Sequence, residues 1–359
     1  MPNEINQGTA VIFKSADQPL FMAHHPLPHP GPGEVLVEIA MTTLCSSDLL
    51  TISGKRQEPV PLILGHESIG RVCQLPTAPV YDLNGSPLQP GDSISWSVFS
   101  APAGNEWAQS GMRQKHPDGI KYGHRQLSEH HFFSGGLASH CHLLPHTCIM
   151  KIPPEASPVS FCPVNCSLAT VMGGFRVAGD IRNQKILITG GGMLGIYSIA
   201  LARTRGAAHI VVSEPLKERH ETCLAFGADE VYRPEELDDQ ASGRFDVTVD
   251  TSGQIRAMQQ GIQSLSVGGI AVWLGAVFPQ KALPLNTEMI VRNLITIQGL
   301  HNYNEVDFQH AVNFMIKHGR DFPFDSLVEQ QFPLQKINEA ISYAREHRPF
   351  RVAVVPGSA

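Results

Sequence analysis

The chain of 359 residues is long enough for about two domains, each with a buried core. A hydrophobic fraction of 42%, a net charge of −6 and the lack of any Lys/Arg-rich block exclude disorder and argue against nucleic acid or an anionic membrane as the main partner. No apolar run approaches the roughly 18 residues of a membrane span, and residues 1–7 lack the pattern of a signal peptide, so the sequence favours a cytoplasmic protein with a small-molecule partner.

Residues 33 to 150 are predicted to form an irregular, mostly antiparallel β domain. Short β-rich pieces, such as residues 34–40, alternate there with Pro- and Gly-rich turns. The seven cysteines of the chain are odd in number and no export signal accompanies them, so metal-binding or core roles are favoured over disulfides.

From about residue 165 the sequence changes to alternating strands and helices. Strands are expected at residues 185–189, 209–213, 246–250 and 269–274, and helices from the turn at 195 through 203 and over 217–226. Such alternation predicts a doubly wound parallel sheet with helices on both faces. Beyond residue 301 we expect helices at 306–318 and 334–346 and a last strand at 350–355, so that the parallel-sheet domain is inserted within the other one.

A glycine turn follows the first strand of the predicted parallel sheet. The turn Gly190-Gly-Gly-Met-Leu-Gly195 fits G-x-G-x-x-G, follows an apolar strand and opens a helix, which is the context of a dinucleotide-binding fingerprint. Gly190 would make the tight turn, Gly192 would let the backbone approach a pyrophosphate, and Gly195 would let helix and strand pack closely. The backbone N–H groups of Met193 and Leu194 at the helix start would face the phosphates.

The second strand of this sheet ends at an acidic residue, Glu214, 19 residues after Gly195. A carboxylate here is expected to accept hydrogen bonds from the adenosine ribose hydroxyls and to repel a 2′-phosphate. NAD is therefore favoured over NADP, while Lys217 and Arg219 lie close enough to soften that preference. The alternative is a purely structural glycine turn with a solvated Glu214.

Cys45, His66 and Cys166 form a candidate metal set. Two thiolates and one imidazole are a known ligand set of catalytic zinc, which leaves a fourth position for water or substrate. Asp48 is a suitable acceptor for the N–H of His66, and Glu67 is placed to reach the far side of the metal or to tune its charge. Taken singly, each cysteine or histidine is more often a core residue than a ligand.

These motifs together resemble one family. The pattern C-x-[ST]-D, then G-H-E-x-x-G, a later cysteine and the glycine turn is similar to the medium-chain zinc-dependent alcohol dehydrogenases, over nearly the whole chain. The resemblance implies an α/β fold in which a GroES-like irregular β catalytic domain, residues 1–167 plus 301–359, is split around a doubly wound parallel-sheet (Rossmann) domain, residues 168–300. It also implies hydride transfer between a primary or secondary alcohol and NAD, by a homodimer or homotetramer.

The resemblance assigns roles to single residues. It implies that Cys45, His66 and Cys166 bind one catalytic zinc. Glu67 becomes a near or exchangeable ligand, and Cys162 is the competitor for the third thiolate. Ser47 matches the hydroxyl that passes the substrate proton outward, next to Asp48. The cofactor contacts that it implies besides the glycine turn and Glu214 are Thr170, Arg219, Gly275, Ala276, Leu300, His301 and, at the pyrophosphate, Arg351.

One departure from the family pattern concerns the proton relay. Many members place a histidine five residues after the first zinc ligand, and that position is Leu50 here. The proton would then pass from Ser47 to a cofactor ribose hydroxyl and water, or another histidine would substitute.

A second departure concerns the structural zinc lobe that many members build from four cysteines. Alignment puts Pro102, Asn105, Ala108 and His116 at those positions. The structural zinc is therefore predicted to be absent, and the loop to be held by packing around Trp96 and Trp107.

A run of histidines invites a second metal site. It comprises His124, His130, His131, His140, His142 and His146. No acidic or cysteine partner stands at ligand spacing around them, so we expect one of them to line the substrate pocket instead.

Residues 121–124 and 135–143 are similar to a subgroup named for its association with phosphonate catabolism. A phosphonate substrate would require basic side chains in the site, for which the candidates are Arg113, Lys115, Lys121 and Arg125. Two other functions remain open: a zinc-independent NAD(P)H reductase on the same fold, and a nucleotide-binding protein without turnover.

Overall fold

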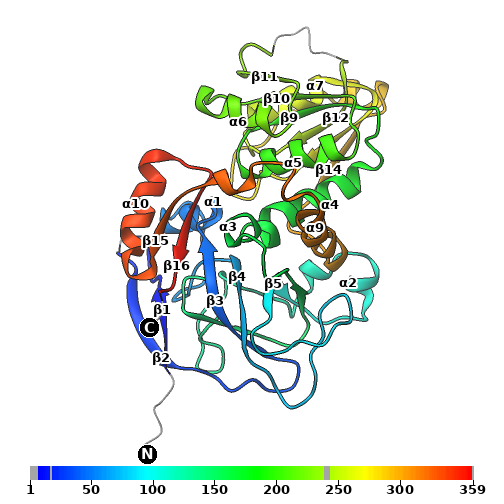
Figure 1. Ribbon diagram of the computed structural model, residues 1–359. Coiled ribbons are helices and arrows are strands. Elements are labelled where there is room, and N and C mark those ends of the chain that lie inside the picture. The colour runs from blue at the N-terminus through cyan, green and yellow to red at the C-terminus, as the bar shows by residue number, and fades with distance from the viewer. Residues whose placement is uncertain (1–6, 17, 238–242, 358–359) are drawn as a thin grey trace, which may run out of the picture. The chain divides into compact units, whose positions relative to one another are not determined.

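The computed structural model describes residues 7–16, 18–237 and 243–357 (Figure 1). Residues 1–6, within the segment where no signal peptide is expected, lie outside these ranges. The described residues form two compact units. The first comprises those up to Cys166, Asn304–Gly319 and those from Phe324 onward, and the second comprises those of Ser167–Tyr303 with Arg320–Pro323. The second unit is thus inserted into the first along the chain.

The first unit is built on an eight-stranded sheet. Its strand order is β15-β16-β3-β4-β5-β6, with β7 also paired to β3 and β8 to β5, and β1 and β2 form a separate antiparallel pair. All pairs except the parallel β15–β16 are antiparallel. The strands are β1 (Gln7–Ile12), β2 (Phe21–Pro26), β3 (Val35–Thr43), β4 (Glu67–Gln74), β5 (Ser93–Ser100), β6 (Ile120–Lys121), β7 (His140–Leu143), β8 (Thr147–Lys151), β15 (Val328–Pro333) and β16 (Arg351–Val355).

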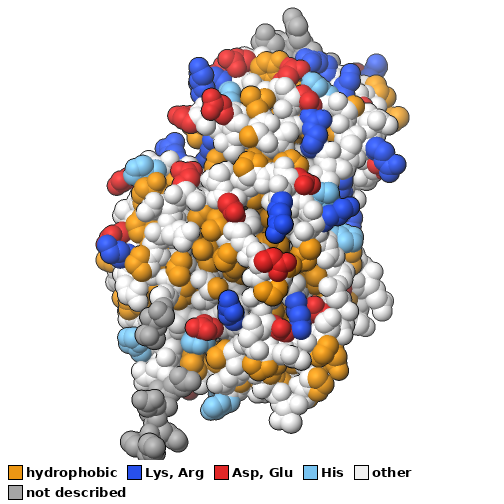
Figure 2. All heavy atoms as spheres, viewed as in Figure 1, with side chains coloured by type: hydrophobic (Ala, Val, Ile, Leu, Met, Phe, Trp, Pro, Cys, Tyr) orange, Lys and Arg blue, Asp and Glu red, His pale blue; other side chains and the backbone are white. Residues whose placement is uncertain are grey.

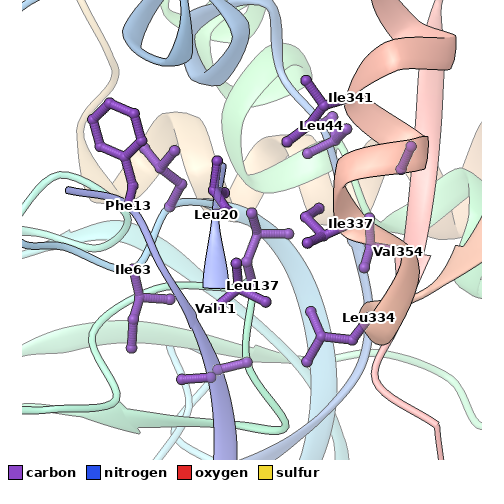
Figure 3. Close-up of a cluster of buried hydrophobic side chains, with 14 of the residues drawn as sticks. Val11, Phe13, Leu20, Leu44, Ile63, Leu137, Leu334, Ile337, Ile341 and Val354 are labelled. Atoms are coloured by element: carbon purple, nitrogen blue, oxygen red, sulfur yellow. The ribbon is translucent and has the colours of Figure 1, made fainter. Parts of the chain in front are cut away.

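Short helices connect these strands, and two longer ones follow the inserted unit. They are α1 (Ser46–Ile52), α2 (Glu106–Gln109), η1 (Arg113–Lys115), α3 (Pro158–Phe161), α9 (Glu305–His318), η5 (Phe324–Leu327), η6 (Leu334–Lys336) and α10 (Ile337–His347). A core of this unit packs the apolar face of α10 against β16, β1 and neighbouring loops, as Figure 3 shows for Ile337, Ile341, Val354 and Val11. This burial of apolar surface fixes the sheet edge next to the loops that carry the candidate ligands.

The second unit is a six-stranded, all-parallel sheet with helices. Its order, β11-β10-β9-β12-β13-β14, corresponds to 3-2-1-4-5-6 and so is the doubly wound arrangement predicted from the sequence. Its elements are α4 (Ala169–Ala178), β9 (Lys185–Thr189), α5 (Met193–Thr204), β10 (His209–Ser213), η3 (Lys217–Arg219), α6 (His220–Ala225), β11 (Glu230–Tyr232), β12 (Phe245–Asp250), α7 (Ile255–Gln263), β13 (Leu265–Trp273), α8 (Thr287–Arg292) and β14 (Thr296–Gly299). A π-helical turn, η2 (Val164–Leu168), leads into it.

None of the helices in the described ranges is long and apolar enough to cross a bilayer. On the face drawn in Figure 2, basic and acidic side chains are interspersed rather than gathered into broad areas of one sign.

Candidate active site

The first candidate ligand, Cys45, lies where strand β3 passes into helix α1. Cys45 is the N-cap residue of α1, with extended backbone, and its side chain is buried. The helix is held to this start by Asp48, whose Oδ2 accepts the Cys45 backbone N–H at 2.9 Å. The acidic residue in the first turn also suits the positive end of the helix dipole.

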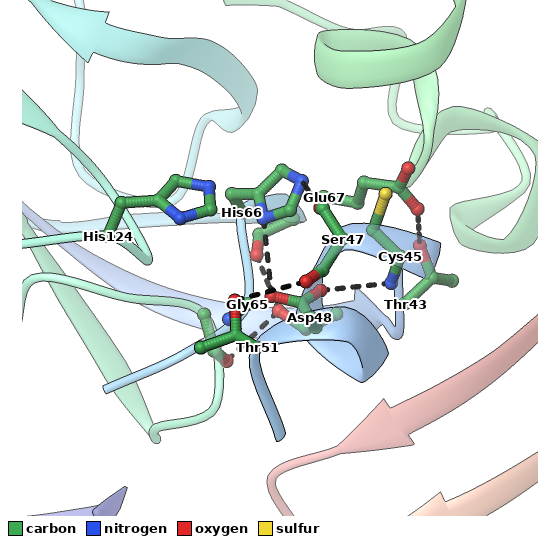
Figure 4. Close-up of polar contacts among 12 residues, drawn as sticks. Thr43, Cys45, Ser47, Asp48, Thr51, Gly65, His66, Glu67 and His124 are labelled. Atoms are coloured by element: carbon green, nitrogen blue, oxygen red, sulfur yellow. Dashed lines mark hydrogen bonds and ion pairs between the residues drawn. The ribbon is translucent and has the colours of Figure 1, made fainter. Parts of the chain in front are cut away.

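Asp48 also holds the loop that carries His66. Its Oδ1 accepts the backbone N–H of Gly65 at 3.2 Å and lies 3.4 Å from Nδ1 of His66 (Figure 4). Asp48 itself is fully buried. One carboxylate therefore binds both the start of α1 and the loop before His66. It faces Nδ1 of His66, which leaves Nε2 of that ring for a metal.

Glu67, the first residue of β4, is paired with Arg351 of β16. The Arg351 guanidinium donates to both Glu67 oxygens at 2.6 Å, and Thr43 donates to the same carboxylate at 2.7 Å. Burial raises the pKa of Glu67, and the charge of Arg351 opposes that rise. In this structure the Arg351 guanidinium binds the carboxylate of Glu67. The expected contact of Arg351 with the cofactor pyrophosphate stays a prediction.

Cys166 lies in the π-helical turn η2 at the end of the first unit. Single π-helical turns are rare overall and are frequently found at functional sites. The preceding Asn165 donates its amide hydrogens to the backbone carbonyls of His66 and Trp96 at 3.0 and 2.8 Å, which anchors the turn beside the second ligand. Cys162, the competing cysteine, instead donates to the backbone carbonyls of Met41 and Glu67.

The structure brings the candidate ligands together. One donor atom each from Cys45, His66, Glu67 and Cys166 lies within 4.8 Å of the others. Tetrahedral zinc, with bonds of about 2.0–2.3 Å, places its ligand atoms about 3.3–3.8 Å apart, so the cluster fits such an ion after a small contraction. In the part of the chain that the structure describes, this is the cluster of His, Cys, Asp and Glu side chains that satisfies metal-site geometry.

Contacts within the cluster shift the protonation equilibria. Hydrogen bonding with Cys166, together with Arg351 and His66, holds the pKa of the Cys45 thiol well below its ordinary value, although burial opposes this, and the same pair interaction raises the pKa of Cys166. Burial disfavours a charged His66, but Asp48 outweighs it and raises its pKa well above the usual value. The lowered pKa favours the thiolate form of Cys45, which is the form that binds metals.

Ser47 and His124 stand next to the ligands. Ser47 Oγ lies 3.4 Å from His66 Nε2, and the ring of His124 lies 4.9 Å from that of His66, centre to centre. Figure 4 shows the His124 imidazole beside the His66 imidazole. Gly123, with a φ of 77°, makes the turn, since a Cβ there would lie 2.6 Å from the carbonyl oxygen of Gly65.

His124 is held by a residue that the sequence analysis did not identify. Its Nδ1 lies 3.1 Å from Glu58 Oε1, and Arg56 binds the same oxygen at 2.7 Å. Burial lowers the pKa of His124, whereas Glu58 acts to raise it. We expected no acidic or cysteine residue at ligand spacing around these histidines, and sequence spacing could not reveal Glu58, which is 66 positions away from His124. A second such partner is Glu34, 2.9 Å from Nε2 of His142.

The loop aligned with the structural zinc lobe is held by hydrogen bonds and ring contacts. Asn105 caps α2 by accepting the Ala108 backbone N–H at 3.1 Å, and Trp107 makes an edge contact with His116. Arg113 is buried, and its guanidinium donates to the backbone carbonyls of Ala101 and His146. Its nomination as a substrate-binding cation is therefore wrong, since these contacts occupy it within the fold.

Trp96 was expected to pack in that loop, and this expectation is also wrong. Its side chain lies in the core cluster with Val35, Val37 and Tyr122. The expectation rested on proximity in sequence to the loop, whereas Trp96 lies within β5, which is buried along nearly its whole length.

In the second unit, the glycine turn follows β9 and opens α5. Gly190 has a φ of 101°, and a Cβ on Gly195 would lie 2.0 Å from the Gly190 carbonyl oxygen. Both positions therefore exclude side chains. Met193 and Leu194 form the first positions of α5, whose N-cap is Gly192.

Glu214 follows β10 and turns towards this glycine turn. Its carboxylate accepts the backbone N–H groups of Gly191 at 2.5 Å and Leu216 at 2.8 Å. Arg219 Nη1 lies 3.7 Å from the position of a Cβ on Gly192. An acid and a base therefore both border the turn.

The other expected cofactor residues of this unit follow the same edge of the sheet. Gly275 and Ala276 come after β13 and Leu300 after β14, and in a parallel sheet the carboxyl ends of the strands share one edge. Thr170 lies in α4. His301, which directly follows Leu300, is half-buried.

Comparison with known proteins agrees with both units. Residues 31–154 match the model of the alcohol dehydrogenase GroES-like domain, and residues 194–317 match that of the zinc-binding dehydrogenases. The chain is 28% identical to L-threonine 3-dehydrogenase of Thermococcus kodakarensis (92% of this chain, 93% of that protein) and 25% identical to sorbitol dehydrogenase of Ovis aries (93% of each). Its fold superposes on an alcohol dehydrogenase of Thermotoga maritima with a TM-score of 0.91 and 26% identity, over 98% of this chain and all of the other.

The chain therefore belongs to the zinc-dependent medium-chain dehydrogenase family, as its motifs predicted. It is an oxidoreductase with a small-molecule substrate.

Proposed function

We propose that this family member transfers a hydride between a primary or secondary alcohol and NAD, giving an aldehyde or ketone. The observation that supports this most is the convergence of Cys45, His66 and Cys166 with Glu67 in one buried cluster, oriented by Asp48. These residues would hold one zinc, which supplies Lewis-acid polarisation of the alcohol oxygen and lowers its pKa.

The residues around the cluster position the alcohol and its proton. Ser47 takes up the hydroxyl proton of the alcohol. Its Oγ lies 3.4 Å from Nε2 of His66, the ring nitrogen left for the metal, and so stands next to the position of the alcohol oxygen. The Ser47 carbonyl accepts the Thr51 hydroxyl at 3.1 Å, which steadies this turn of α1. With Leu50 at the usual relay position, the proton would leave through a cofactor hydroxyl and water, and His124 would line the substrate side.

NAD is the proposed cofactor, bound at the glycine turn. Glu214 supports this choice, since its buried carboxylate borders the turn and would repel a 2′-phosphate. Arg219, beside Gly192, would lessen the discrimination. A ratio of kcat/KM of at least ten in favour of NAD is expected, and a preference for NADP would contradict the assignment.

Zinc analysis together with a panel of alcohols and aldehydes tests the proposal. We expect one zinc per chain and turnover in the wild type. Cys45→Ala should lose the metal and at least a hundredfold in turnover, whereas Cys73→Ala, a half-buried thiol on β4, should keep both. An active zinc-free wild type would instead indicate a zinc-independent reductase, and cofactor binding without turnover a nucleotide-binding protein. The expected homodimer or homotetramer is checked by light scattering.

A further inference from the structure

His124 and Glu58 form a largely buried polar pair beside the candidate metal cluster. Nδ1 of His124 faces Oε1 of Glu58 at 3.1 Å, and the two side chains are 9% and 12% exposed. The His124 ring lies 4.9 Å from the ring of His66, centre to centre (Figure 4). The hydride and proton steps proposed above do not use Glu58. A few fixed polar groups beside the reacting centre are what gives a ligand site its specificity, so we asked what this pair recognises.

Backbone packing fixes the place of His124. Its turn approaches the loop before His66 so closely that a Cβ on Gly123 would lie 2.6 Å from the Gly65 carbonyl oxygen. The backbone N–H of Gly123 also donates to the Ser134 carbonyl at 2.8 Å. Main-chain contacts therefore hold the His124 ring next to that of His66.

The segment that carries Glu58 is held on both sides. Before Glu58, the backbone N–H of Arg56 donates to the Leu50 carbonyl, in the last turn of α1, at 3.1 Å. After Glu58, the Pro61 carbonyl accepts the backbone N–H of Leu127 at 2.8 Å, just beyond the turn that carries the histidine. Hydrogen bonds therefore join the two loops on which the carboxylate and the imidazole meet.

Nε2 of His124 is left for a ligand. Glu58 takes the Nδ1 side of the ring, and within the described ranges the imidazole makes no other hydrogen bond. Arg56 binds the same Glu58 oxygen at 2.7 Å and offsets its charge, so the pair does not select for a cation. A ring nitrogen accepts or donates one hydrogen bond according to its protonation, and a hydroxyl group can do both. A hydroxyl group therefore suits this position in either state of the ring.

We propose that His124 binds a second hydroxyl group of the substrate, on the carbon next to the one that carries the reacting hydroxyl, so that vicinal diols are preferred over simple alcohols. The neighbouring carbon is chosen because the His124 ring directly contacts a candidate metal ligand. The proposal rests on the dehydrogenase function proposed above and names its substrate class. His124 is the specificity-determining residue, and Glu58 is a positioning residue that holds the ring.

The first test compares matched alcohols with the zinc-loaded full-length protein. The probes are butane-2,3-diol, butan-2-ol and 3-aminobutan-2-ol, which differ only in the group on the neighbouring carbon. We expect kcat/KM for the diol to exceed that for butan-2-ol about tenfold or more, because a site that hydrogen-bonds a hydroxyl rejects the analogue that lacks it. Equal use of the diol and butan-2-ol, or better use of the amino alcohol than of the diol, overturns the proposal.

Variants of the pair assign this preference to its residues. His124→Leu should lower the ratio of the two kcat/KM values about tenfold, whereas His124→Gln, which keeps a polar amide, should retain part of it. Glu58→Leu should also lower the ratio, and Glu58→Gln, whose carbonyl oxygen can still accept Nδ1–H, should restore it. Glu34→Leu is the matched control, because Glu34 forms a similar pair with His142 at 2.9 Å, and it should leave the ratio unchanged. A ratio within twofold of the wild-type value in His124→Leu overturns the proposal.

The second test measures binding without turnover, with no cofactor present to accept the hydride. Ligand-observed NMR titration of the zinc-loaded protein should show that butane-2,3-diol binds at least fivefold more tightly than butan-2-ol. This difference should disappear in His124→Leu and persist in Glu34→Leu. The same difference in a protein that oxidises no alcohol would reject the dehydrogenase function and retain the His124 site. Alcohol turnover without any preference for the diol would retain the function and reject the site.

Discussion

Asp48 links the candidate ligands Cys45 and His66. One oxygen caps the helix that begins after Cys45, and the other holds Gly65 and faces Nδ1 of His66. A carboxylate behind a ligating imidazole fixes its tautomer and raises its basicity. The residue therefore acts on the metal through both the backbone and the ring.

Asp48→Asn tests this role. The amide keeps the size and one acceptor oxygen but loses the charge that favours Nδ1–H on His66. We expect zinc affinity and kcat/KM to fall about 10–100-fold, as is typical for such supporting residues. Chelator competition gives the affinity, and steady-state kinetics give the rate.

Asp307→Asn is the matched control for that variant. Asp307 is also buried and also closes a capping box, since it accepts the N-cap backbone N–H of Asn304 at 3.1 Å at the start of α9. It should change the free energy of unfolding by about 1 kcal/mol and leave zinc affinity unchanged. Equal loss of zinc affinity in both variants would show that Asp48 acts through helix capping alone.

The sequence identified the residues that the structure brings into one cluster better than it identified their surroundings. Cys45 and His66 stand in local motifs, so the sequence pattern around each of them indicates a candidate ligand. The pairing of Glu67 with Arg351 joins residues 284 positions apart. His124 likewise reaches His66 through the turn at Gly123, and no local pattern distinguishes it from the other histidines nearby. Such contacts depend on how the strands pair across the sheet.

Strand β9, the glycine turn and helix α5 form the element on which cofactor binding would depend. Gly195 faces the Gly190 carbonyl so closely that the helix start lies directly on the turn. This contact lets the first N–H groups of α5 point at one spot, as pyrophosphate binding requires.

Gly195→Ala should therefore impair cofactor binding. Its Cβ would lie 2.0 Å from the Gly190 oxygen, so the helix start must move. We expect NAD affinity to fall at least tenfold in fluorescence titrations, with a lower melting temperature.

Gly261→Ala in α7 is the control, because its Cβ would meet Thr248 at an ordinary 3.4 Å. It should keep NAD affinity and gain up to about 1 kcal/mol from helix propensity. Unchanged affinity in Gly195→Ala would contradict the role of the turn.

Element prediction succeeded where the apolar pattern was strong. The strands at 185–189 and 209–213 were predicted with their observed bounds, since buried parallel strands are continuous apolar runs. β13 begins at Leu265, earlier than expected, because the glycines before residue 270 resemble a turn. β14 and β15 were missed, since they are short, largely exposed strands with few apolar residues.

At the scale of the whole molecule, the inserted unit interrupts the first one without disturbing its sheet. β15 and β16 come from the far end of the chain, yet β16 pairs with β3, the strand that leads to Cys45. That pairing carries Arg351 to Glu67. The candidate metal cluster therefore depends on residues from both ends of the chain, which explains why the sequence identified the clustered residues but not the ion pair between Glu67 and Arg351.

The buried histidines of the first unit also tie the stability of the molecule to pH. His131 is 3% exposed and lies 2.8 Å from the His142 carbonyl, to which its Nε2 donates. Burial lowers its pKa to about 4, although the His142 carbonyl acts to raise it. An unfolded histidine titrates near 6.5, so between these values the unfolded chain binds more protons. Its contribution to stability is therefore complete above about pH 6.5 and is lost as the pH falls towards 4.

His131→Gln should remove this dependence, because glutamine keeps an N–H donor for the His142 carbonyl but does not titrate. Between pH 7 and pH 5, the wild type should lose about 2 kcal/mol more of its free energy of unfolding than the variant does in urea titrations. His310→Gln, at an exposed position of α9, should follow the wild type at both pH values. Parallel losses in the wild type and His131→Gln would show that the acid sensitivity lies in groups other than the buried ring of His131.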